Sequence, residues 1–375
     1  SCKVLVVTGC MAQRYKNEII EEVPEVDAVL GTTSYGDILK AIREAMEGKH
    51  FQEFKDIDYL PEKLGKRVLT TGGHFGYLKI AEGCDKHCTY CIIPKLRGKF
   101  RSVPMERLVT QAKEMAEEGV KELILVAQET TVYGTDIYGK KSLHILLKEL
   151  CKIKGIRWIR VLYCYPEEIY DELIQTMKEE KKICHYLDLP IQHASDRILK
   201  RMGRRTTQAE LVEIVNKLRR EIPDIVLRTT LISGFPGETQ EDHEELMGFV
   251  DEMEFDRLGV FTYSPEEDTP AATMPDQVAE EVKEARRDEI MELQQEISYD
   301  KGTDRIGQEL LVMIEGKVAD ESAYIGRTYG DAPKVDGYIF VQTGELLMTG
   351  DFAKVRVTGA LEYDLIGELA DEYTE

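Results

Sequence analysis

The sequence of 375 residues has no long apolar run, has few cysteines, and has fewer basic than acidic residues. No stretch approaches the roughly 18 apolar residues that a membrane span requires, and the first residues lack the charged, apolar and small-residue succession of an export signal. Eight cysteines are also too few for a disulfide scaffold. These absences predict a cytoplasmic protein with free thiols and no membrane association.

The charge balance restricts the expected partners. Lys and Arg number 49 against 70 Asp and Glu, which gives a formal net charge of -21. A negative field slows encounter with a polyanion, so direct nucleic-acid binding is not expected and a basic partner is favoured. Acidity can also serve only to keep a protein dispersed, so charge alone does not decide between these interpretations.

Residue patterns divide the chain into three parts joined by one linker. Residues 1–60 alternate short apolar strands with helical spacing and predict the end of an α/β domain, and residues 61–75 read as a polar linker. Residues 76–301 alternate strands with amphipathic helices. The expected strands are 77–83, 122–128, 158–163, 186–190, 226–233 and 257–263. Six such units predict a parallel sheet in a partial (β/α)6 barrel, because a closed barrel of this kind needs eight.

The C-terminal part has a different periodicity. After a charged helix over 275–300, apolar residues in 302–375 alternate with a period of two between Gly and Asp turns, which predicts a small antiparallel β-barrel. Residues 303–375 carry six basic and fifteen acidic side chains, a net charge of -9. The overall fold class is therefore α/β, with a separate β module at the end.

The most informative motif is GCDKHCTYCIIP, in which Cys84, Cys88 and Cys91 follow the CxxxCxxC spacing. A 4Fe-4S cube has four irons, so three cysteines leave one iron open for an exogenous ligand. The alternative is a structural zinc ion with His87 as the fourth donor. Adjacent His87 and Cys88 could not readily bind one ion without backbone strain, so the spacing favours an iron-sulfur cluster.

This loop resembles the signature of the radical S-adenosylmethionine (SAM) superfamily. The resemblance implies that Cys84, Cys88 and Cys91 hold a catalytic 4Fe-4S cluster whose open iron chelates the amino and carboxylate groups of SAM. It further implies reductive cleavage of SAM to a 5'-deoxyadenosyl radical, which abstracts hydrogen from unactivated carbon. The reductant would be an electron donor such as flavodoxin.

The same resemblance implies further contacts with SAM. Tyr90, between the second and third ligands, would hydrogen-bond the adenine through its backbone, and Gln128 and Glu129 would bind the amino end of SAM. Gln192 would face the same cavity, and Arg228 would pair with the carboxylate of SAM. Loop packing is an equally good explanation for Tyr90. A charge such as that of Arg228 inside an apolar strand needs a partner, so burial without function is the less favoured interpretation.

Near the N-terminus, TGCMAQR resembles the third cysteine motif of the methylthiotransferase N-terminal domain. Cys10 would then be one ligand of a second, auxiliary 4Fe-4S cluster, whose other two ligands are expected upstream. The chain begins like a strand entered midway, with no Met, so we expect an upstream segment to be missing. A free buried thiol is the alternative. The remaining cysteines, Cys2, Cys151, Cys164 and Cys184, are expected to be ordinary thiols.

The resemblance covers the whole chain: the end of a methylthiotransferase domain, a radical SAM core and a TRAM barrel. Residues 127–139, AQETTVYGTDIYG, and residues 333–344, PKVDGYIFVQTG, are similar to the RimO-like branch, although Glu129 replaces the more usual Asp. That branch adds a methylthio group to the β-carbon of an aspartate in small-subunit ribosomal protein twelve. The MiaB-like branch modifies a tRNA adenosine instead.

Charge distinguishes these branches independently of the motifs. A barrel that binds tRNA should be basic, whereas this barrel is acidic, as expected for docking a Lys- and Arg-rich ribosomal protein. The sequence therefore predicts a RimO-type enzyme. The alternatives are a tRNA methylthiotransferase and a non-catalytic, zinc-bearing adaptor that binds the ribosome.

Overall fold

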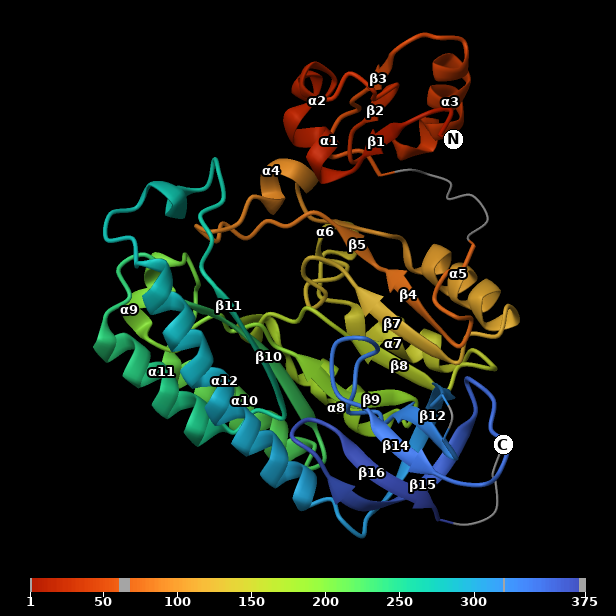
Figure 1. Cartoon of the computed structure of the whole chain (residues 1–375), viewed down its shortest axis with the longest axis vertical. Coiled ribbons are helices and arrows are strands. Elements are labelled where there is room, and N and C mark those ends of the chain that lie inside the picture. The colour runs from red at the N-terminus through yellow and green to blue at the C-terminus, as the bar shows by residue number, and fades with distance from the viewer. Residues whose placement is uncertain (1, 61–67, 320, 371–375) are drawn as a thin grey trace.

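The computed structural model describes residues 2–60, 68–319 and 321–370. It has three units, and the N-terminal unit and the C-terminal barrel lie at opposite ends of a central sheet (Figure 1). Residues 61–67 of the predicted linker fall outside the described residues, and the last linker residue, Phe75, already belongs to the first strand of the central sheet. Among the described residues, no helix has both the length and the apolar character to cross a membrane.

The N-terminal unit is a parallel sheet of three short strands with helices around it. Its elements are β1 (Val6–Thr8), α1 (Cys10–Tyr15), α2 (Asn17–Glu22), β2 (Ala28–Leu30), a 3-10 turn (Tyr35–Asp37), α3 (Ile38–Met46) and β3 (Phe51–Glu53). Cys10 is the first residue of α1, and Gly9 alone separates it from β1. Strand β3 was not predicted, because three residues are too short a pattern to recognise.

The central unit is a six-stranded parallel sheet in the order β11-β10-β9-β8-β7-β4, which confirms the predicted fold class. Its strands are β4 (Phe75–Lys79), β7 (Glu122–Val126), β8 (Trp158–Val161), β9 (Ile183–Asp188), β10 (Val226–Ser233) and β11 (Arg257–Thr262). The predicted first strand is shorter than expected. Its last residues, Ala81–Glu82, form β5, which pairs with β6 (Arg101–Ser102) outside the main sheet.

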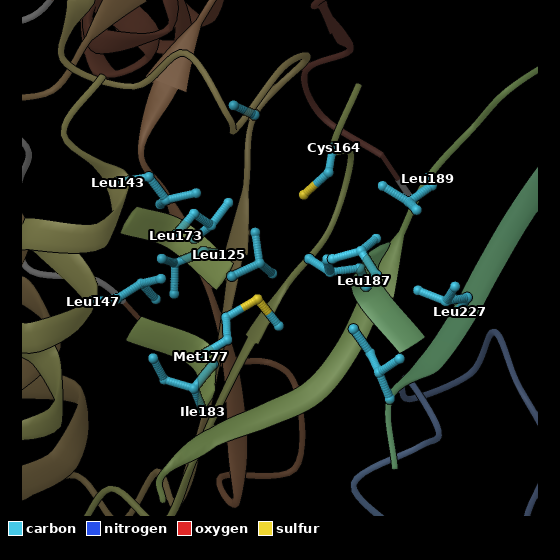
Figure 2. Close-up of a cluster of buried hydrophobic side chains, with 14 of the residues drawn as sticks. Leu125, Leu143, Leu147, Cys164, Leu173, Met177, Ile183, Leu187, Leu189 and Leu227 are labelled. Atoms are coloured by element: carbon cyan, nitrogen blue, oxygen red, sulfur yellow. The ribbon is translucent and has the colours of Figure 1, made fainter. Parts of the chain in front are cut away.

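Helices connect these strands. They are α4 (Ile93–Arg97), α5 (Met105–Glu117), α6 (Thr135–Tyr138), α7 (Leu143–Cys151), α8 (Asp171–Glu179), α9 (Asp196–Arg201), α10 (Gln208–Glu221), α11 (Gln240–Met253) and α12 (Glu280–Thr303), with 3-10 turns at Pro166–Glu168 and Pro270–Thr273. The main core lies between the sheet and its helices. Figure 2 shows part of it, where leucines of β7 and β9 pack against α7 and α8. Cys164 lies in this core, as expected of an ordinary thiol.

A capping box begins α11. The side chain of Thr239 accepts a hydrogen bond from the backbone N–H of Asp242, and the carboxylate of Asp242 accepts one from the backbone N–H of Thr239 at 2.8 Å. Arg197 and Ser195 also donate to this carboxylate. Burial alone would raise the pKa of Asp242, but these hydrogen bonds outweigh it and lower the pKa to about 2.

Asp242→Ala should therefore destabilise the protein in a pH-dependent way. The folded-state pKa lies below the ordinary value of 3.8, so the stabilisation is complete above that value and is lost as the pH falls through about 2. We expect a loss of about 2 kcal/mol in the free energy of unfolding at pH 7. Urea titrations of both proteins at several pH values measure this difference, and a difference that stays constant down to pH 2 would contradict the assignment.

The C-terminal unit is a closed barrel in the order β12-β13-β14-β16-β15. Its strands are β12 (Glu309–Lys317), β13 (Ala323–Arg327), β14 (Ile339–Gln342), β15 (Phe352–Ala360) and β16 (Leu365–Leu369). The barrel was predicted as antiparallel, but β14 and β16 pair in parallel. Five strands around a closed ring cannot all alternate in direction, so one pairing of this kind is unavoidable.

The barrel is joined to the sheet through buried charges. Glu122, at the start of β7, accepts hydrogen bonds from Arg160 of β8 at 2.8 Å and from Arg327 of β13 at 2.7 Å. All three side chains are 0% exposed. Beside them, the ring of Trp158 packs edge-on against Phe352 of β15, with centroids 4.8 Å apart. The barrel therefore covers the end of the sheet at which the strands begin.

Candidate active site

The cysteine loop leaves the sheet at the end where the strands finish. It follows β4 and β5 and runs into α4, as predicted for chemistry at the carboxyl ends of parallel strands. The loop is fixed by its backbone: Gly83 donates to Oε1 of Gln128 at 2.9 Å, and Cys84 donates to the carbonyl of Gly98 at 3.1 Å. Gly83 has a φ of +80°, and a Cβ there would collide with the carbonyl of Lys99, so only glycine fits.

The three thiols of this loop lie close enough to influence one another. Cys84 and Cys88 are buried and Cys91 is half-buried. Burial raises the pKa of Cys84 to about 11, and the neighbouring thiols Cys88 and Cys91 contribute in the same direction. Burial also raises the pKa of Cys91. Without a metal, Cys84 and Cys91 therefore stay protonated at neutral pH and are poor free nucleophiles, and a metal that binds them must displace their protons.

The donor set of this loop suits a 4Fe-4S cluster. Three thiols come from one short segment, and each thiolate of such a cluster binds a different iron, which leaves the fourth iron open to an exogenous ligand. Cys84, Cys88 and Cys91 would hold the cluster.

A cavity of about 600 Å³ opens beside these thiols. It is lined by Tyr77, Lys79, Cys84, Cys91, Ile93, Val126, Ala127, Gln128, Tyr163 and Tyr165. Its volume lies in the range of small-molecule and cofactor sites, and its walls are mostly apolar with a few polar groups. A ligand in this cavity would touch two of the three thiols directly.

Two of the predicted SAM contacts lie at or near this cavity. Gln128 lines it, with its amide oxygen occupied by the N–H of Gly83. Glu129 is buried next to it, and its Oε1 accepts hydrogen bonds from the backbone and hydroxyl of Thr131. Burial raises the pKa of Glu129 to about 7. The other carboxyl oxygen, Oε2, has no hydrogen-bond partner among the described residues, so it could accept one from a ligand.

The other predicted contacts are not brought to the cavity wall. The ring of Tyr90 packs edge-on against Phe235, with centroids 6.3 Å apart, so this side chain serves packing. Gln192 adopts a left-handed backbone with φ of 73°, and its carbonyl accepts from Ile232 at 2.8 Å. An isolated parallel β-bridge places Gln192 beside Leu231 of β10. Neither observation assigns a ligand contact.

Arg228 is held away from the cysteine loop. It lies near the start of β10, where its guanidinium pairs with Asp188 at 2.8 Å and with Asp336 of the C-terminal unit at 3.3 Å. The charge has the partners that burial demands, but they come from the sheet and the barrel. These contacts give the predicted pairing of Arg228 with SAM no geometric support.

Sequence reasoning missed several side chains that line the cavity. Tyr77 and Lys79 come from β4, and Tyr163 and Tyr165 follow β8. Tyr163 is 46% exposed and has a left-handed φ of 59°, held by the carboxylate of Asp188, which accepts from its N–H at 3.1 Å. Their position at strand ends was the available signal, but tyrosine and lysine there are common without function.

The N-terminal unit docks beside the cysteine loop through α4. The sulfur of Cys10 accepts a hydrogen bond from Nε of Arg97 at 3.2 Å, and the hydroxyl of Thr32 donates to the carbonyl of Leu96 at 3.0 Å. Arg14 of α1 pairs with Glu266 after β11. The loop with Cys84, Cys88 and Cys91 therefore leads into the N-terminal end of α4, and Cys10 contacts the residue at its C-terminal end. Cys10 is half-buried between the units.

Comparison with known proteins agrees with this geometry. Residues 78–250 match the radical SAM superfamily, and residues 306–370 match the TRAM domain. A protein of Lachnoclostridium phytofermentans named ribosomal protein uS12 methylthiotransferase RimO is 64% identical over 98% of this chain and 83% of its own length. A protein of the same name from Clostridium perfringens is 53% identical over 99% of this chain and 83% of its own.

The chain belongs to the RimO family of radical SAM methylthiotransferases. Membership implies a 4Fe-4S cluster and SAM as cofactors, which the thiols and the cavity fit. Among solved structures, the cobalamin-dependent SAM radical enzyme OxsB superposes on 78% of this chain and 43% of its own, with a TM-score of 0.48 and 15% identity.

Proposed function

We propose that this chain transfers a methylthio group to the β-carbon of an aspartate in ribosomal protein uS12. Relatives named ribosomal protein uS12 methylthiotransferase align over 98% and 99% of the chain, so every unit described above has its counterpart in them. The observation that carries the proposal is the cavity lined by Cys84 and Cys91, because it offers both a cluster site and room for two ligands. The ribosomal substrate supports the cytoplasm as the compartment.

Residues of the cysteine loop and the cavity wall would bind the cluster and the ligands. A 4Fe-4S cluster with SAM supplies a radical that abstracts hydrogen from carbon. Cys84, Cys88 and Cys91 hold the cluster, and the bond from Gly83 to Gln128 fixes the loop against β7. Oε2 of Glu129 is available to an amino group, and Tyr77, Tyr163 and Tyr165 of the wall would contact the bound ligands. The electron would come from a donor such as flavodoxin.

We further propose that Cys10 is one ligand of an auxiliary 4Fe-4S cluster that supplies the sulfur. Three observations support it. Cys10 lies at the first residue of α1, directly after a strand, its thiol is half-buried between the units, and Arg97 donates to the sulfur. Hydrogen bonds to cluster sulfurs are a usual means of tuning such centres. Since Arg97 ends α4 and the cysteine loop begins it, the sulfur source would stand next to the cavity.

The acidic barrel is the surface that we propose for docking uS12. Residues 303–375 have a net charge of -9, which favours a basic protein and disfavours nucleic acid. The barrel would then act as a docking module for the central unit.

The division proposed from the sequence, at residues 60, 75 and 301, is supported by the separate matches over 78–250 and 306–370.

Separate reactions with the two candidate substrates test the proposal. Cluster-loaded enzyme is incubated separately with uS12 and with unmodified tRNA, and each product is examined for a methylthio mass increment. We expect the increment on uS12 alone, and none with the Cys88→Ala variant. Modification of tRNA would instead favour the MiaB-like activity, and no modification of either would favour the non-catalytic adaptor.

A further inference from the structure

The cavity beside the cysteine loop has an imbalance of charge, which concerns Lys79. Among the described residues that line the cavity, Lys79 carries the only positive charge, and the others are tyrosine, cysteine, glutamine and apolar side chains. A cation in a largely apolar wall is costly unless it is solvated or paired. The side chain of Lys79 is 46% exposed, so it is open to the cavity.

Strand geometry explains how Lys79 reaches this position. Phe75, Tyr77 and Lys79 alternate along β4, so their side chains lie on one face of the sheet. Phe75 packs in the buried cluster against the barrel, and Tyr77 and Lys79 line the cavity. The intervening Leu78 belongs to the main core on the opposite face. The ammonium thus stands at the end of β4, five residues before Cys84.

The ammonium of Lys79 pairs with Glu82 but keeps N–H donors available for a further partner. Lys79 pairs with Glu82, and Glu82 also lies 3.6 Å from the guanidinium of Arg97. An ammonium has three N–H donors, and the hydrogen bond to Glu82 takes one of them. Because Glu82 is shared between two cations, it orients Lys79 without fully neutralising both. A second carboxylate could therefore bind Lys79 from the cavity side.

Two other cations, Lys86 and Arg204, contact Tyr165 of the cavity wall but do not line the cavity themselves. Lys86 pairs with Glu168, and Arg204 pairs with Glu167 at 3.4 Å. The guanidinium of Arg204 stacks over the ring of Tyr165 at 4.2 Å, and the ammonium of Lys86 lies 5.0 Å from the same ring. Neither residue lines the cavity. This leaves Lys79 as the group best placed to meet a negative ligand there.

We propose that Lys79 binds the carboxylate of the substrate aspartate and so selects aspartate as the residue that is modified. The inference rests on the proposed function, in which hydrogen is taken from the carbon next to that carboxylate. A charge-assisted hydrogen bond fixes the side chain of the substrate and places its β-carbon at the cluster end of the cavity. The carboxylate of SAM offers the same chemistry, so the experiment must separate the two sources.

The test compares wild type with Lys79→Gln, Lys79→Arg and the control Lys152→Gln, which removes an exposed lysine of α7's C-terminal turn. Binding of two uS12 peptides, one with the target aspartate and one with asparagine in its place, is measured by calorimetry. SAM affinity and substrate-free 5'-deoxyadenosine formation are measured in parallel. We expect wild type, Lys79→Arg and Lys152→Gln to prefer the aspartate peptide by roughly tenfold, and Lys79→Gln to lose this preference with unchanged SAM affinity.

Two results would overturn the assignment. A fall in SAM affinity with the peptide preference intact would place Lys79 on the cosubstrate, and an unchanged preference and affinity would leave it no ligand at all. Failure of the proposed function looks different, because wild type itself would then neither distinguish the two peptides nor modify uS12. Folding of Lys79→Gln is checked by its melting temperature, which should be close to that of wild type because the side chain is half exposed.

Discussion

Replacing Cys88 with alanine should abolish the reductive cleavage of SAM, so that 5'-deoxyadenosine falls to the level of an enzyme-free reaction. Cys88 is one of three thiols available to the cluster, and a cube held by two protein ligands would lose iron or bind SAM in the wrong geometry. The same result is expected for Cys84→Ala and Cys91→Ala. Chromatography of reactions with dithionite as reductant measures the yield.

The matched control is Cys151→Ala, which removes a half-buried thiol at the end of α7 that does not line the cavity. It should cleave SAM at the wild-type rate. Metal and sulfide analysis of protein kept free of oxygen accompanies the assay, with about four iron atoms and four sulfides expected for one cube. Zinc in their place, or a normal yield from Cys88→Ala, would refute the radical mechanism.

Much of the central sheet could be predicted because its strands are buried on both faces. Runs such as Leu123, Ile124 and Leu125 lie between amphipathic helices, and all three residues are fully buried. The cysteine loop could also be recognised from the sequence, because the spacing of its metal ligands depends only on the local chain. Local patterns of this kind carry their own evidence in the sequence, and they predicted the fold class and the cluster site.

What could not be predicted depends on contacts between distant segments. The pairing of Arg228 with Asp336 joins residues more than a hundred positions apart, and nothing in either neighbourhood indicates the other. The parallel pairing of β14 with β16 follows from closing five strands, which a period of two cannot reveal. Lys79 illustrates the same limit at the site, since its importance comes from the cavity that four separate segments build around it.

The charges between the sheet and the barrel are a second consequence of such distant contacts, and they fix the position of the barrel. Removing the Glu122 carboxylate leaves the guanidinium groups of Arg160 and Arg327 fully buried beside each other. Breaking a buried ion pair from one side costs much more than the pair itself contributes. Glu122→Gln should therefore lower the free energy of unfolding by about 3–5 kcal/mol, measured by urea denaturation.

The control Glu149→Gln breaks an exposed pair with Lys152 and should cost about 0–1 kcal/mol. Burial alone would raise the pKa of Glu122, but Arg327 and Arg160 outweigh it and hold the pKa below its ordinary value of 4.5. The stabilisation is thus complete above that value and is lost as the pH falls through the lower folded-state pKa, so the two proteins should converge only in acid. Equal stability of Glu122→Gln and wild type at pH 7 would show that other contacts, such as those of Trp158 with Phe352 and of Arg228 with Asp336, are sufficient to hold the barrel.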